Sequence, residues 1–130
     1  YKTDSMNPAY LMTSAAIPKS QRVSGIVIDA REHAVDPSMS PEVIDMAGKL
    51  VYGTTSYTRS KAVNRGPVGY AYSMDDRNVG QRVGSNPLFI EAVGSLDDDV
   101  YITSMDAEKV RDAEKSFGVL SNCRVMLLLQ

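Results

Sequence analysis

The sequence holds very few of the residues that build reactive centres, with one cysteine and one histidine in 130 residues. Because Cys123 stands alone, the chain can form no internal disulfide and no cysteine-only zinc site. Because His33 stands alone, histidine-rich metal sites and the usual catalytic triads are excluded as well. The sequence also lacks a G-x-S-x-G nucleophile motif and a Walker-type phosphate loop. We therefore expect a protein that is not an enzyme and that needs no cofactor or metal.

An excess of positive charge is also missing, since 14 lysines and arginines stand against 16 aspartates and glutamates for a net charge of -2. Nucleic-acid binding is therefore not expected, because no surplus of basic side chains is available to neutralise phosphates. Long apolar runs are absent too. The longest, VMLLL at residues 125–129, is far shorter than the roughly 18–20 residues of a membrane-spanning helix. The sequence thus predicts no transmembrane segment.

What the sequence does have is enough length for one domain and too little for two. Residues 1–21 stand apart, because they contain Pro8 and Pro18, many serines and threonines, and apolar pieces too short to show a period. Such a stretch is either a disordered leader or an arm that docks on a neighbouring subunit. We predict an extended N-terminal arm over residues 1–21 and a single domain over residues 22–130.

The predicted strands are recognised by runs of β-branched and other apolar residues. Residues 22–31 and 123–129 are apolar on both faces, which is typical of central strands in a covered sheet. Gly25 inside the first of these strands indicates a bulge or a close approach of another backbone. Residues 43–46 and 49–52 predict a hairpin. Further strands are predicted at residues 68–72, 88–93 and 100–102, with the last two paired across an acidic turn at residues 94–99.

Two helices are predicted from capping residues and apolar spacing. The first begins at Ser73 and ends at Gly84. The second begins at Thr103, whose capping partner is Asp106, and ends at Gly118 after an apolar stripe at three- and four-residue steps. The polar segment at residues 53–67 is predicted as loop with some helix. The fold class is therefore α+β, with a mixed sheet of about five or six strands, two helices and the extended arm.

The densest group of titratable side chains follows the first strand, at residues 29–36. It contains Asp29, Arg31, Glu32, His33 and Asp36, at the end of a strand, where sites often form. One interpretation is a divalent-metal or general-base site made by the histidine and two acids. The other is an ion pair between Asp29 and Arg31, with Glu32 and His33 facing water. The lack of a second histidine or a nearby cysteine favours the ion pair.

Several short motifs occur in a defined order: GIVIDAR at residues 25–31, PSMSP at 37–41, VYG at 51–53, GY at 69–70, RVGSNPL at 82–88, SMDA at 104–107 and CRV at 123–125. In this order they resemble the bacterial lipoprotein and flagellar-assembly family that includes flagellar proteins P and T. The likeness covers about residues 22–130. It implies an extracytoplasmic, non-enzymatic protein that assembles into rings or sheets through contacts between copies.

We therefore expect a structural subunit of the cell envelope or cell exterior that self-assembles into a ring or filament. Its partners would be further copies of itself and envelope or flagellar proteins. The alternative is a monomeric periplasmic binding module that uses the loop from Asp29 to Asp36. The residues expected to contact a neighbouring subunit are Tyr10, Leu11, Met12 and Ile17 of the arm and Asn86 and Pro87 of the domain.

Overall fold

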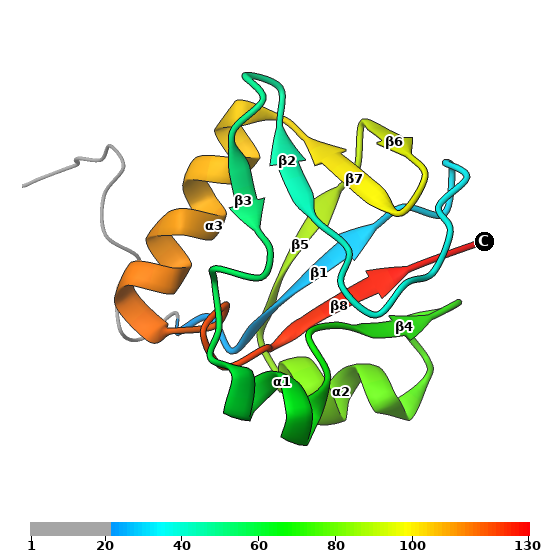
Figure 1. Cartoon of the computed structure of the whole chain (residues 1–130). Coiled ribbons are helices and arrows are strands. Elements are labelled where there is room, and N and C mark those ends of the chain that lie inside the picture. Colours follow the sequence, from blue (N-terminus) through cyan, green and yellow to red (C-terminus); the bar gives the residue numbers. More distant parts are fainter. Residues whose placement is uncertain (1–21) are drawn as a thin grey trace, which may run out of the picture.

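The computed structural model describes residues 22–130, which contain eight strands and three helices (Figure 1). The predicted α+β class is confirmed. The strands form two sheets of four, where the sequence indicated one sheet of five or six, and a third helix is present. The elements are β1 (Gly25–Asp29), β2 (Val43–Asp45), β3 (Leu50–Tyr52), α1 (Arg59–Arg65), β4 (Gly69–Ala71), α2 (Arg77–Val83), β5 (Pro87–Glu91), β6 (Gly94–Leu96), β7 (Asp99–Ile102), α3 (Ser104–Phe117) and β8 (Val125–Leu128).

The first sheet has the order β4-β8-β1-β5, and all of its strands are parallel. In the register of this sheet, Ile26 of β1 lies between Leu88 of β5 and Val125 of β8. Both β1 and β8 are central, as their unbroken apolar sequences predict, and nearly every residue in them is buried.

The second sheet has the order β3-β2-β7-β6 and is mixed. The predicted hairpin is present as β2 and β3, with Gly48 at a φ of 85° in its turn. The predicted pairing of residues 88–93 with 100–102 is wrong, because β5 joins the first sheet and β7 pairs with β6. Asp97 adopts a φ of 55°, which closes a much tighter hairpin inside the expected acidic turn.

Local capping explains where the helices begin and end. Thr103 caps α3 by accepting a hydrogen bond from the Asp106 N–H at 3.1 Å, and Gly118 ends it in the left-handed region, as predicted. The predicted start of α2 at Ser73 is wrong, because Ser73 forms a turn with Asp75 and the cap is Asp76. In the segment at residues 53–67, α1 forms although none of its residues is buried.

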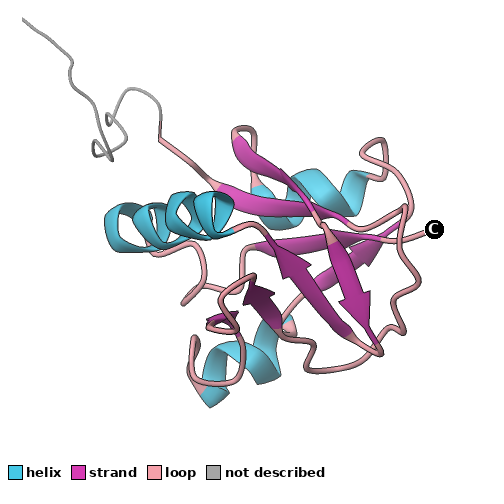
Figure 2. Cartoon of the chain, turned by 90° about the horizontal axis from the view of Figure 1, so that it is seen from above, coloured by secondary structure: helices cyan, strands magenta, loops and turns pink. Residues whose placement is uncertain are grey.

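The hydrophobic core is divided by the first sheet. Its main part lies between the two sheets, and α3 closes this part beside β3 (Figures 1 and 2). The smaller part lies on the opposite face of the first sheet, where Val79 and Val83 of α2 pack on Val27, Met126 and Leu128. Because β1 and β8 are covered on both faces, their side chains contribute to both parts of the core.

Gly25 is the point where α2 lies closest to β1. A Cβ atom at this position would lie 2.6 Å from both the Cα and the Cβ of Val83. The close approach predicted from the sequence is therefore confirmed. The adjoining residue Ser24 donates its hydroxyl to the Val83 carbonyl at 2.5 Å, which fixes the C-terminal end of α2 on the start of β1.

Replacing Gly25 by alanine is expected to lower the free energy of unfolding by about 1–3 kcal/mol, because the added methyl group overlaps the α2 backbone. Gly80→Ala is the matched control, since a Cβ there meets nothing within 4 Å. Alanine is also the better helix former by about 0.5–1 kcal/mol, so this change is expected to stabilise. Urea denaturation measures both effects. A Gly25→Ala protein as stable as the parent would contradict the close packing.

Candidate functional site

The loop that follows β1 begins with an ion pair. The Arg31 guanidinium donates to both carboxylate oxygens of Asp29, at 2.9 and 2.8 Å, and the Arg31 backbone N–H donates to one of them at 3.0 Å. The hydrogen bond from the Arg31 side chain holds the pKa of Asp29 below its usual range. The ion pair predicted at this loop is confirmed. The Asp29 carboxylate and the Arg31 guanidinium therefore bind each other within the loop.

The expectation that His33 faces water is wrong, because its side chain is half-buried at the carboxyl end of the parallel sheet and bonds to the backbone there. Its Nε2 lies 3.1 Å from the Ala92 carbonyl oxygen, so this nitrogen carries the proton and donates it. Beside it is a hollow of about 280 Å³ lined in part by Asp36, Tyr72 and Gln130. Within residues 22–130, no three His, Cys, Asp or Glu side chains are grouped so as to hold a metal ion. The hydrogen bond from His33 thus fastens the loop to the residue that follows β5, beside a hollow with both polar and apolar walls.

The predicted subunit contacts divide into two sets. Tyr10, Leu11, Met12 and Ile17 lie outside the described residues. Asn86 and Pro87 lie at the start of β5, which is an edge strand of the first sheet.

Asn86 is bound within its own domain. It donates its side-chain amide to the Arg22 carbonyl at 2.7 Å and its backbone N–H to the Ser24 hydroxyl at 2.9 Å. Pro87 opens the edge strand, where its missing N–H is tolerated. Two residues further on, the Phe89 side chain is 45% exposed.

Among residues 22–130, no helix lies over the outer face of the second sheet (Figure 1). Val43, Val100 and Ile102 point into the core, so the alternating residues of the same strands point outward. On the outward side, Ile44 lies opposite both Leu50 and Tyr101. Leu96, which lies opposite Asp99, continues the same side and is 61% exposed. We call these four residues the outer apolar face: Leu50, Ile44, Tyr101 and Leu96.

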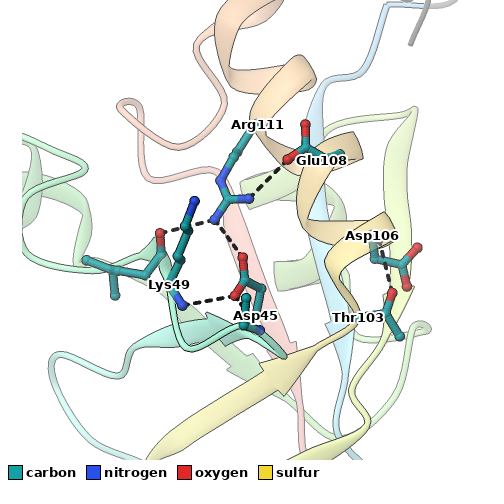
Figure 3. Close-up of polar contacts among 8 residues, drawn as sticks. Asp45, Lys49, Thr103, Asp106, Glu108 and Arg111 are labelled. Atoms are coloured by element: carbon teal, nitrogen blue, oxygen red, sulfur yellow. Dashed lines mark hydrogen bonds and ion pairs between the residues drawn. The ribbon is translucent and has the colours of Figure 1, made fainter. Parts of the chain in front are cut away.

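A buried carboxylate ties this sheet to α3 (Figure 3). Asp45 is 3% exposed, and one of its oxygens accepts from the Ala47 and Lys49 N–H groups, both at 2.9 Å. The other oxygen accepts from the Arg111 guanidinium at 3.0 Å, and Arg111 also pairs with Glu108 on α3. The Lys49 backbone N–H and then Arg111 hold the pKa of Asp45 below its usual range.

The pairing of Asp45 with Arg111 was not predicted from the sequence. A signal was present in the run Val-Ile-Asp-Met-Ala-Gly at residues 43–48, where a lone acid precedes a turn. Aspartate at such a place forms a turn by accepting hydrogen bonds from the next backbone N–H groups. The distant partner, Arg111, has no comparable signal in the sequence.

Together these features define an α+β domain of two sheets, whose ion pairs lie within the domain and whose second sheet has an apolar outer face that no other part of residues 22–130 covers with a helix (Figure 1). The family described as Treponema pallidum Tp0624, second domain, matches residues 25–130, and the chain belongs to this family. The match begins at the first residue of β1 and includes every helix and strand described above. No curated protein matches the chain significantly. The resemblance to flagellar proteins P and T stays a prediction.

Among the helices of residues 22–130, none has both the length and the apolar character required to cross a lipid bilayer.

The Asp45 carboxylate is expected to make stability depend on pH. Because its pKa is lowered in the folded state, its stabilising contribution is complete above the unfolded value of about 3.9 and is lost as the pH falls through the folded pKa. Asp45→Asn keeps an oxygen for the turn but removes the charge that pairs with Arg111. We expect its Tm to lie below that of the parent at neutral pH and the two values to converge in acid.

The control for this comparison is Asp75→Asn, which removes the same charge from an exposed site. Thermal unfolding followed by circular dichroism from neutral pH down to about pH 3 measures the difference. A Tm difference between Asp45→Asn and the parent that stays the same over this range would contradict the ionic role of Asp45.

Proposed function

We propose that the chain is a non-enzymatic structural subunit of the cell envelope or exterior, which self-assembles into a ring or filament through its N-terminal arm. The observation that carries this proposal is the outer apolar face of the second sheet. In its register Ile44 lies opposite Leu50 and Tyr101, and Leu96 lies opposite Asp99 on the same side of the sheet. Among residues 22–130, no helix lies over these side chains (Figure 1). Leu50 and Leu96 are exposed, and Ile44 and Tyr101 are half-buried. Groups of exposed apolar side chains on one side of a sheet mark surfaces that bind other chains.

The composition of the arm suits this face. Tyr10, Leu11, Met12 and Ile17 supply apolar and aromatic side chains of the types that are enriched at protein interfaces. Twenty-one residues precede Arg22. Fully extended, such a segment spans up to roughly 70 Å, well beyond a domain whose radius of gyration is about 13 Å. An arm of this length is able to reach the outer apolar face of a neighbouring copy.

The location and the partners belong to the same proposal. An extracytoplasmic site, with envelope or flagellar proteins as further partners, follows from the resemblance of the motifs at residues 25–125. The alternative of a binding module at residues 29–36 has weaker support, since Asp29 and His33 are both engaged within the domain.

Deletion of residues 1–20 is expected to abolish assembly while leaving the domain folded, because the arm supplies one side of the proposed contact. Light scattering and electron microscopy of the purified full chain and the truncated chain measure the difference. Truncated protein that assembles as the parent does would exclude the arm as the connector. Full-length protein that stays a homogeneous monomer at high concentration would overturn self-assembly itself.

The outer apolar face is tested separately by Leu96→Glu. A buried charge would oppose docking, so we expect the concentration at the midpoint of assembly to rise by about tenfold or more. Val63→Glu is the matched control, because Val63 is also an exposed apolar residue but lies on α1, away from this face. Size-exclusion chromatography with light scattering measures both variants. Equal effects of the two substitutions would show that the face is not the docking surface.

A further inference from the structure

A second surface, unrelated to the outer apolar face, lies where α2 meets α1 and β4. It contains a hollow of about 380 Å³ lined by the side chains of Arg65, Arg82, Asn78 and Gln81, with Tyr70 and Met126 on its apolar wall. We propose that this hollow binds a small organic oxyanion, with its carboxylate or phosphate group on the two arginines and its apolar part against Tyr70.

Arg82 is held rigidly in place by neutral groups. Its guanidinium donates to the carbonyls of Gly66 at 3.1 Å, Cys123 at 2.9 Å and Arg65 at 2.5 Å. These bonds cap the C-terminal end of α1 and fasten it to the start of β8. They orient the arginine without supplying a negative charge, because all three acceptors are backbone carbonyls.

Arg65 brings a second positive charge to the same hollow. Burial, and then the nearby charge of Arg65, lower the pKa of Arg82. Within residues 22–130, neither arginine forms an ion pair with a carboxylate, whereas Arg31 and Arg111 both do. Two neighbouring guanidinium groups without a carboxylate are suited to a planar or tetrahedral oxyanion, which they hold by charge-assisted hydrogen bonds.

The remaining lining residues fit the same class of ligand. The amides of Asn78 and Gln81 offer further N–H donors, and none of the lining residues from the described part of the chain is acidic. Gly69 forms part of its floor, where a Cβ atom would lie 2.7 Å from Arg82 Nε and 2.8 Å from Met126 Cε. Glycine at this position therefore leaves room for the Arg82 side chain to lie flat along the sheet.

Calorimetric titration of the full chain at low salt tests the proposal, with phenyl phosphate and benzoate as separate probes. We expect saturable binding of one molecule per chain for at least one probe, and the stronger probe identifies the preferred oxyanion. Arg65→Gln is expected to weaken binding by about tenfold or more, because one charge-assisted contact is lost. The Arg65 side chain is exposed and only its carbonyl is used in the fold, so this variant keeps the structure.

Lys115→Gln is the control, because it removes one positive charge from an exposed site on α3. It is expected to leave the affinity unchanged.

The second variant is Gln81→Glu, which places a carboxylate beside the two arginines and is expected to abolish binding without unfolding the protein. The proposal is overturned if neither probe binds below about 10 mM, if Arg65→Gln and Lys115→Gln weaken binding equally, or if Gln81→Glu binds as the parent does.

Discussion

The contact between α2 and β1 at Gly25 is the constraint on which much of the remaining structure depends. With no side chain at Gly25, Val83 approaches the strand closely enough for α2 to cover the first sheet. The same helix carries Arg82. Two of its three hydrogen bonds reach the C-terminal end of α1, and the third reaches the Cys123 carbonyl just before β8. One close approach therefore sets the position of a helix, and that helix sets the position of two further segments.

The two sheets are held together by different kinds of interaction. Apolar side chains fill the space between them, and this contact is not directional. Asp45 adds a directional element, because its carboxylate fixes both the hairpin turn and the distance of that turn from Arg111 on α3. Where the chain passes from β5 to β6, the Val93 N–H donates to the Tyr101 carbonyl at 2.8 Å and joins the edge of one sheet to the other.

The sequence predicted those parts of the fold that depend on neighbouring residues. Thr103 and Gly118 define α3 by local hydrogen bonds, and the unbroken apolar run at residues 125–128 predicted a central strand. Partner choice between distant strands was not predictable, because β5 and β7 have equally suitable sequences and only the assembled core selects between them. The Asp45–Arg111 pair joins residues 66 positions apart, so no local pattern could indicate it. The helix α1 has no buried face and therefore no apolar period to reveal it.

The central position of β8 has a consequence for how the domain is made. Ile26 pairs with Val125, so the strand that completes the first sheet is the last of the domain to leave the ribosome. Until it arrives, β5 is the only described strand that can take its place beside β1, and the other edge of β1 stays open to any strand of similar sequence. A nearby nascent copy carries such a strand. Synthesis of many copies close together therefore favours exchange of β8 between chains. A fold built from adjacent hairpins would avoid this hazard, because each strand would pair with the one made just before it.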